Sequence, residues 1–166
     1  MAHRSGGGGL GKQVAVHEAR KRELISQLEL YGRQLAWLGQ RIDPKDDKSR
    51  TRFEVRKSED FSLNLPDVEA QHLLRYLEDI GWAQPSGTGI AGVSSTEIMA
   101  WSRGMGIGLD PWEFEAIRRA SRAYCQQFSS NDSREPTFDP LTNPPKTSAV
   151  QALAGALNRS NREDKA

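Results

Sequence analysis

The spacing of apolar side chains along the chain predicts a mainly helical protein. In the first third, six large apolar residues recur at spacings of 4, 3, 4, 3 and 4, namely Leu24, Leu28, Tyr31, Leu35, Leu38 and Ile42. A period of 3.5 residues is typical of a helix that packs along another helix. We therefore predict one long amphipathic, coiled-coil-like helix over residues 13–42. It should end before Pro44, because proline disfavours helical geometry in the residue that precedes it.

The sequence leaves open what this long helix packs against. Its apolar stripe spans fewer than three heptads, which is short for a coiled coil. Self-association through residues 24–42 and packing on the rest of the same chain are both compatible with it. Gly32 and Gly39 lie beside the stripe, and each costs roughly 1 kcal/mol in a helix relative to alanine. We therefore expect another backbone to approach closely at both glycines.

Three further helices are predicted within residues 66–128, each with an apolar face: 66–80, 95–103 and 111–128. The first begins at proline, which suits the first turn of a helix. The second follows a capping-box pattern in which Ser94 is the N-cap and Glu97 is three residues on. The third follows Asp110 as N-cap, with proline next and Glu113 in the third position. These helices predict a small helical domain.

The remaining segments are polar or rich in glycine and proline. We expect a flexible leader over 1–12, a linker over 43–65 and a disordered linker over 129–147. A short docking helix and tail are expected over 148–166, where a few apolar residues recur at helical spacing. The predicted fold class is therefore all-α, with a long N-terminal helix, a small three-helix domain, a flexible linker and a short C-terminal helix.

Composition and charge indicate a soluble intracellular protein. The 166 residues carry 23 basic and 22 acidic side chains, so no strong attraction to nucleic acid or membranes is expected. No apolar run is long enough for a transmembrane helix or a secretory signal, and Cys125 has no second cysteine to pair with. Residues 1–60 have a net charge of +4 and residues 61–128 of −3. This asymmetry favours head-to-tail self-association, but weakly.

Candidate catalytic chemistry is sparse. The glycine pattern at 6–12 resembles a phosphate loop, but it lacks the Ser or Thr after Lys12 and a preceding strand. The pattern at 87–92 follows a helix instead of a buried strand, so it is better interpreted as a glycine-rich turn between helices. The three histidines are scattered, and Cys125 has no partner at metal-ligand spacing. We expect no enzyme activity, no metal and no cofactor.

A small DNA-binding regulator of the helix-turn-helix type is the alternative from another class. The predicted helices 95–103 and 111–128 follow one another, and the second carries Arg118, Arg119 and Arg122. The seven-residue break between them exceeds the usual turn of about 3–4 residues. A recognition helix also reads bases with its first residues, which here would include Trp112 and Glu113. We therefore do not expect a nucleic-acid partner.

The tryptophans are the remaining candidates for function. Trp82, Trp101 and Trp112 fall at helix edges, where each either fills the core or anchors a partner protein. We favour the core for Trp101. We favour the anchor for Trp112, because residues in the first turn of a helix are less often enclosed on all sides.

Short motifs between residues 95 and 124 resemble the tail assembly chaperones of long-tailed, siphovirus-type bacteriophages. They are STEIMAW at 95–101, a glycine break ending in Leu109, PWE at 111–113 and SRAY at 121–124. The resemblance covers residues from about 72 to 128, roughly a third of the chain. It implies a helper in the host cell cytoplasm, absent from the mature virion, that keeps the tape measure protein soluble and recruits tail tube (major tail) subunits.

The long basic helix is not a feature associated with that family, so a structural tail-associated component is a further alternative. In either case the work would be done by protein–protein contacts. The candidate partner-binding residues are Leu28, Leu35, Leu38, Trp101, Asp110, Pro111, Trp112, Glu113 and Tyr124.

Overall fold

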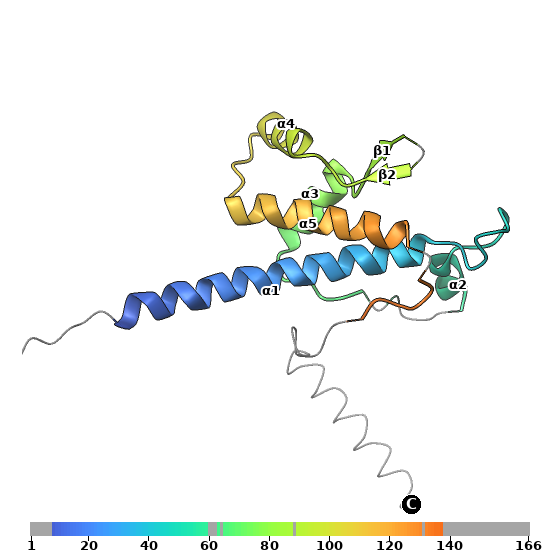
Figure 1. Cartoon of the computed structure of the whole chain (residues 1–166), viewed down its shortest axis with the longest axis horizontal. Helices are drawn as coiled ribbons and strands as arrows, with labels where there is room; N and C mark the ends of the chain where they lie inside the picture. Colours follow the sequence, from blue (N-terminus) through green and yellow to red (C-terminus); the bar gives the residue numbers. More distant parts are fainter. Residues whose placement is uncertain (1–7, 60–62, 64, 88, 131, 138–166) are drawn as a thin grey trace, which may run out of the picture.

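The computed structural model describes residues 8–59, 63, 65–87, 89–130 and 132–137, which form five helices and a two-stranded hairpin (Figure 1). They are α1 (Gly8–Gly39), α2 (Arg52–Ser58), α3 (Gln71–Ile80), β1 (Gln84–Ser86), β2 (Gly89–Ala91), α4 (Ser95–Met105) and α5 (Pro111–Phe128). The mainly helical class predicted from the sequence is confirmed.

The segments predicted at the two ends of the chain lie partly or wholly outside the described residues. The expected leader over 1–12 is wrong for its last residues, because α1 begins at Gly8; glycine disfavours a helix without forbidding it. Of the linker expected over 129–147, only 129–130 and 132–137 are described. The docking helix expected over 148–166 lies outside the described residues.

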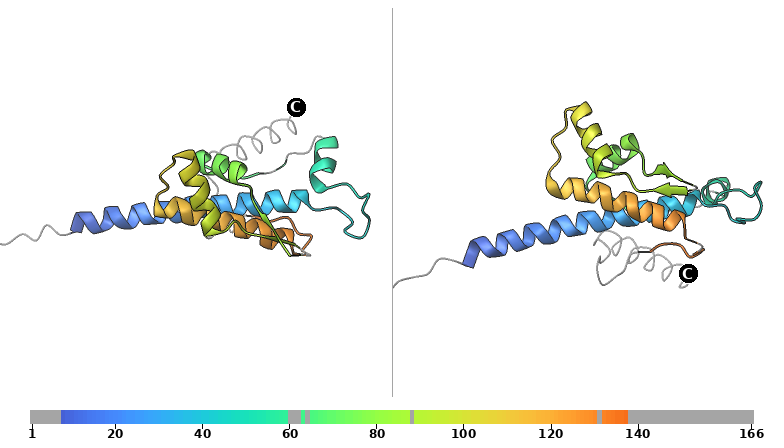
Figure 2. Two further views of the ribbon diagram at one scale, coloured as in Figure 1. Left: turned by 90° about the horizontal axis from the view of Figure 1, so that it is seen from above. Right: turned by 45° about the horizontal axis from the view of Figure 1, so that its top comes forward.

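Helices α1 and α5 lie side by side and run in the same direction (Figures 1 and 2). Residues later in α1 contact residues later in α5. Glu29 accepts two hydrogen bonds of 2.9 Å from Arg119. The side-chain Nε2 of Gln40 lies 2.8 Å from the carbonyl oxygen of Gln127 at the end of α5. The long helix is therefore part of the same core as residues 66–128 and does not form a separate unit.

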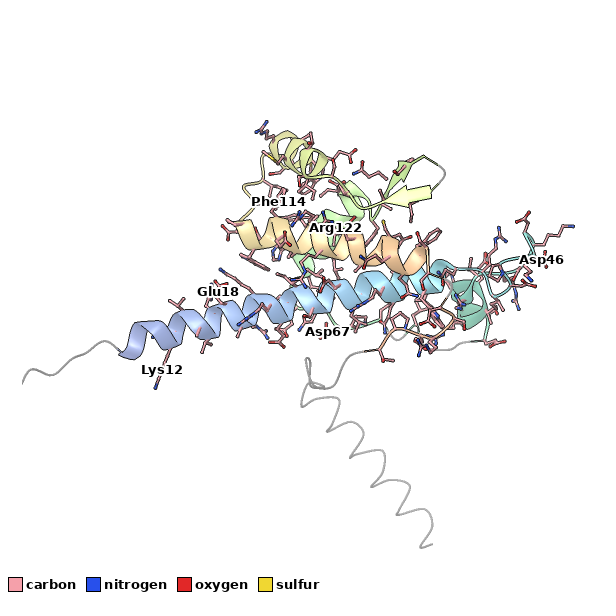
Figure 3. All side chains as sticks on the ribbon, viewed as in Figure 1. Lys12, Glu18, Asp46, Asp67, Phe114 and Arg122 are labelled. Atoms are coloured by element: carbon pink, nitrogen blue, oxygen red, sulfur yellow. The ribbon has the colours of Figure 1, made fainter. Side chains whose placement is uncertain are left out.

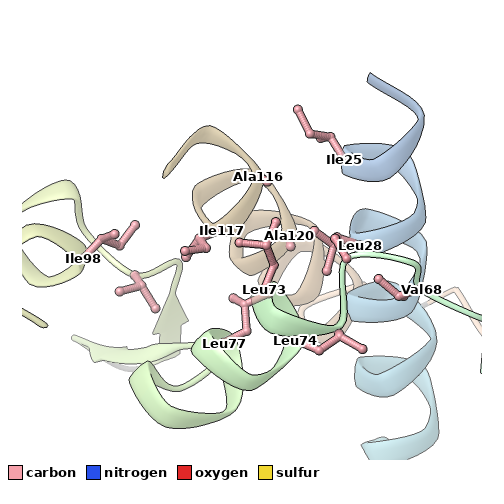
Figure 4. Close-up of a cluster of buried hydrophobic side chains, with 12 residues drawn as sticks. Ile25, Leu28, Val68, Leu73, Leu74, Leu77, Ile98, Ala116, Ile117 and Ala120 are labelled. Atoms are coloured by element: carbon pink, nitrogen blue, oxygen red, sulfur yellow. The ribbon is translucent and has the colours of Figure 1, made fainter. Parts of the chain in front are cut away.

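That core is formed by one stripe of α1 together with α3, α5, Ile98 of α4 and the loops between them (Figure 4). It consists of Ile25, Leu28, Val68, Ala70, Leu73, Leu74, Leu77, Val93, Ile98, Ala116, Ile117 and Ala120. Small residues face α1 from α5, whereas larger side chains come from α1 and α3. The alternation lets the two parallel helices approach closely.

The chain before α3 differs from the prediction. Residues 66–70 are not helical, and α3 begins at Gln71. Instead this segment runs past α1, where Val68 is buried and Glu69 exchanges two hydrogen bonds with Gln27. The Gln27 amide satisfies backbone and side-chain groups of Glu69, so the extended segment replaces the predicted first turn of the helix at Pro66.

Two further segments form structure that the sequence did not predict. The glycine-rich turn over 87–92 is part of an antiparallel hairpin in which Gln84 pairs with Ala91, and Gly87 turns the chain with a φ of +55°. The predicted linker over 43–65 contains α2. Thr51 and Glu54 close a capping box at the start of that helix.

The starts of α4 and α5 agree with the predicted signals. The hydroxyl of Ser94 accepts a hydrogen bond of 3.2 Å from the backbone N–H of Glu97. The carboxylate of Glu113 accepts one of 2.9 Å from the backbone N–H of Asp110. Helix α4 ends at Gly106, whose φ of +66° is the left-handed conformation that glycine favours.

Candidate functional site

The leucines predicted to bind a partner belong to the interior. Leu28 and Leu38 are buried, and Leu35 is half-buried. Leu28 lies in the core between α1, α3 and α5. The 3.5-residue repeat therefore packs on the protein's own chain. Leu28 and Leu38 are therefore corrected from candidate partner-binding residues to core residues, whereas self-association through residues 24–42 stays a prediction.

Of the two glycines beside the repeat, one lies at a close approach of backbones. A Cβ added at Gly32 would lie 2.9 Å from the carbonyl oxygen of Ala120 and 3.0 Å from the ring of Trp82. At Gly39 nothing lies within 4 Å of such an atom. The expected close approach is found at Gly32 and is wrong for Gly39, which lies at the exposed end of α1.

Tyr124 belongs to a row of aromatic rings along the contact between α1 and α5. Tyr31, Trp82, Tyr124 and Phe128 follow one another with centroid distances of 5.9, 5.8 and 6.1 Å. Burial raises the pKa of the Tyr31 and Tyr124 hydroxyls. The half-buried Tyr124 ring therefore takes part in the packing of this row.

Ser121, part of the SRAY motif, is buried and connects two loops. Its hydroxyl donates a hydrogen bond of 2.8 Å to the carbonyl oxygen of Trp82 and accepts one of 2.8 Å from the N–H of Val93. We did not predict this pair of hydrogen bonds from the sequence. The signal that could have suggested it is a serine on the apolar face of a helix, at a spacing that points it into the core.

The PWE motif and the preceding aspartate form the first turn of α5. Pro111 is exposed there. One carboxylate oxygen of Glu113 accepts a hydrogen bond from the backbone N–H of Asp110. The other oxygen lies 2.8 Å from Nε2 of His72 on α3. The sequence did not predict this contact, because the two residues are 41 positions apart.

The two tryptophans for which opposite roles were expected are both half-buried. Trp112 packs against the core, although part of its ring is exposed. Trp101 lies at the surface between α4 and α3, where its indole N–H donates a hydrogen bond of 2.5 Å to Asp79. Its ring contacts Tyr76 with a centroid distance of 5.1 Å. The reason is that α4 contributes only Ile98 to the core and leaves its other side chains outside.

A second cluster surrounds Trp37 near the end of α1. The guanidinium groups of Arg52 and Arg56 lie 4.8 and 5.0 Å from the ring centroid. The indole N–H donates a hydrogen bond of 2.9 Å to Ser133, and Arg56 forms two hydrogen bonds with Glu135. Burial lowers the pKa of Arg52. The cluster attaches α2 and residues 132–137 to α1.

The arginines of α5 that suggested DNA binding already have partners. Arg119 is paired with Glu29 of α1 and Arg118 with Glu115, while the stem of Arg122 lies against Gly92. Over the part of the chain that the structure describes, no cluster of three or more His, Cys, Asp or Glu side chains has a metal-binding arrangement. No described helix is both long and apolar enough to cross a membrane.

The most exposed element is the first part of α1, which we call the arm (residues 8–22). It extends beyond the start of α5 and points away from the rest of the molecule (Figures 1 and 2). Every residue from 11 to 20 is exposed, including Val14 at 62% and Val16 at 70%. At its base Arg20 forms ion pairs with Glu23 and Glu69. Among the described residues, the arm is thus the helical surface with the least support from its own chain.

Comparisons with protein-family models, curated proteins and solved structures gave no match to this chain.

Proposed function

We propose that the protein is a non-catalytic binding protein that acts as a tail assembly chaperone of a long-tailed bacteriophage. It binds the tape measure protein, and recruits tail tube subunits, in the host cell cytoplasm and is not retained in the mature virion. The resemblance of residues 72–128 supplies the family, and the long helix, which is not associated with that family, supplies a surface for a partner.

The single observation that carries the proposal is the arm. A helix of its length is only marginally stable in water on its own, and Val14 and Val16 lower its intrinsic helix propensity further. A protruding helix with exposed apolar residues therefore gains stability when a partner helix or groove covers it. Long helices of a tape measure protein provide such a partner.

The DNA-binding alternative has less support. Arg118 and Arg119, two of the three arginines that suggested it, form ion pairs within the protein. Helix α5, which would have to enter the major groove, packs along α1 through its small residues. Binding DNA through Arg118 and Arg119 would require these ion pairs to be exchanged for phosphate contacts.

Co-expression tests the proposed function. The proposal predicts a long, helix-rich reading frame downstream of this chain in its genome, and the chain should be produced together with that product. We expect that product to become soluble and to co-purify with the chain. A tape measure protein that stays insoluble, or a chain that instead shifts DNA in a salt-dependent manner, would contradict the proposal.

A further inference from the structure

The arm carries positive charge that its own chain does not neutralise. Residues 8–22 contain four basic side chains and one acidic side chain. Arg20 and Lys21 pair with glutamates on the same helix. Among the described hydrogen bonds and ion pairs, none involves Lys12 or Arg22, and both are exposed. Lys12 projects from the arm into open space (Figure 3).

A surface of opposite character lies on the body of the molecule, where α3, α4 and the start of α5 meet. We call it the acid–aromatic face, made by His72, Tyr76, Asp79, Trp101 and Glu113. The rings of His72 and Tyr76 are in edge contact with a centroid distance of 5.7 Å. Tyr76 contacts Trp101, Trp101 donates to Asp79, and His72 contacts Glu113. The five side chains therefore form one continuous surface.

The charge of this face suits a basic ligand. The face contains two carboxylates, and two more lie near it. Glu97 is one helical turn before Trp101, and Asp110 directly precedes α5. The cations on α3 and α4 are Arg75 and Arg103. Those of α5 begin at Arg118, beyond its first turn, and Arg118 and Arg119 are paired with Glu115 and Glu29. Carboxylates therefore exceed unpaired cations around the face. Aromatic faces and carboxylates are the groups that bind Lys and Arg side chains, by cation–π contacts and by charge-assisted hydrogen bonds.

The arm cannot reach the acid–aromatic face of its own molecule. Helix α1 is continuous from Gly8 to Gly39, and its arm points away from the body (Figure 1). Two arms are also poorly suited to each other, because both carry the same net positive charge. The complementary surface that every molecule brings is the acid–aromatic face of a second copy.

We propose that the arm of one copy binds the acid–aromatic face of the next, so that the protein associates head to tail. Such a contact uses different surfaces on the two molecules, so it extends into chains unless the rotation closes a ring. One further step rests on the proposed function: a tape measure helix competes for the same arm and dissociates the head-to-tail assembly.

Analytical ultracentrifugation of the full chain tests the association. At low salt, the weight-average mass should rise steadily with protein concentration. It should fall toward that of the monomer at about 1 M NaCl, where charges are screened beyond about 3 Å. A mass that stays monomeric at all concentrations at low salt, or association that is indifferent to salt, would overturn the proposal.

Two variants interrupt the contact from either side. Lys12→Glu with Arg22→Glu reverses the charge of the arm. Asp79→Asn with Glu97→Gln removes two negative charges at the face while keeping an oxygen to accept the hydrogen bond from Trp101. Each should weaken association about tenfold or more. Lys45→Glu with Lys48→Glu is the matched control, since it changes net charge equally in an exposed loop at the other end of α1. If this control weakens association as much as the arm variant, the proposal fails.

Mixing the two variants distinguishes this contact from any symmetric one. The arm variant retains a normal face and the face variant retains a normal arm, so one contact can form between them and no more. We expect a heterodimer that does not grow with concentration. Continued absence of association, or growth beyond a dimer, would contradict a head-to-tail contact. Circular dichroism confirms that each variant is folded, and no tape measure protein is present, so failure here leaves the proposed function untouched.

Discussion

Gly32 shows how one missing methyl group sets the distance between two helices. A Cβ there would lie 2.9 Å from the carbonyl oxygen of Ala120, which cannot move without disturbing α5. We expect Gly32→Ala to lower the free energy of unfolding by about 1–3 kcal/mol, because overpacking outweighs the gain in helix propensity. Urea denaturation measures the change.

Gly39 is the matched control for this substitution. It lies on the same helix with open space around it, so Gly39→Ala should leave the urea midpoint unchanged or raise it slightly. Equal effects of the two substitutions would mean that α1 and α5 do not approach closely at Gly32.

Cys125 should be chemically quiet in the folded protein. It is buried on α5, and burial raises the pKa of its thiol. The reactive form is the thiolate, so we expect a thiol reagent at neutral pH to label the native chain slowly and the urea-unfolded chain at once. Rapid labelling of the native chain, followed by absorbance, would show that this part of α5 is open.

For single residues, the sequence identified which side chains take part in packing more reliably than it predicted what surrounds them. Leu28 was placed on the apolar stripe of a helix and Trp112 was expected to anchor a partner, but whether such residues face a partner or the core depends on which helix lies opposite. That information is tertiary. The bond between Trp101 and Asp79 and the contact between His72 and Glu113 join distant positions, so no local pattern could predict them.

Among the elements, α2 offers a test by pH. The carboxylate of Glu54 accepts the backbone N–H of Thr51 at 2.7 Å, and this bond lowers the pKa of Glu54. A depressed folded-state pKa means that the stabilisation is complete above the unfolded-state pKa and is lost as pH falls through the folded-state pKa. We expect the helical chemical shifts of residues 52–58 to diminish over that range.

Glu54→Gln provides the control for this titration. Glutamine can still accept the hydrogen bond but does not titrate. The helical chemical shifts of α2 in the variant should therefore not change over this pH range. Identical acid behaviour of variant and wild type would mean that another group controls α2.

Helix α1 divides into a part that stabilises the fold and a part that does not. Leu28 is fully buried, so Leu28→Ala should cost about 2–5 kcal/mol of unfolding free energy. Val16 is exposed, so Val16→Ala should change stability by less than about 0.5 kcal/mol. Urea melts of the two variants that show similar losses would contradict the division.

The elements themselves were largely predictable where local signals decide them. Ser94 before α4 and Pro111 within α5 are capping signals that act within one turn, and both helices begin there. The start of α3 was misplaced because Glu69 forms hydrogen bonds with Gln27 of α1, a contact outside the local sequence. The hairpin was missed because each strand is only three residues long.

For the whole molecule, the structure joins what the sequence had separated. The predicted long helix and small domain share one core, and the Trp37 cluster attaches residues 132–137 to the same helix. What extends from this body among the described residues is the arm. The second half of α1 therefore belongs to the core, and under the proposed function the first half, the arm, binds the partner.

The most direct test of this assignment is capture of the co-expressed tape measure protein by the variant Val14→Asp with Val16→Asp. We expect an unchanged urea midpoint and loss of capture, because charged residues replace the exposed apolar ones. Ile42→Asp with Phe53→Asp, two exposed apolar residues at the other end of α1 and on α2, is the control and should capture normally. Normal capture by the arm variant, with its fold intact, would contradict the account.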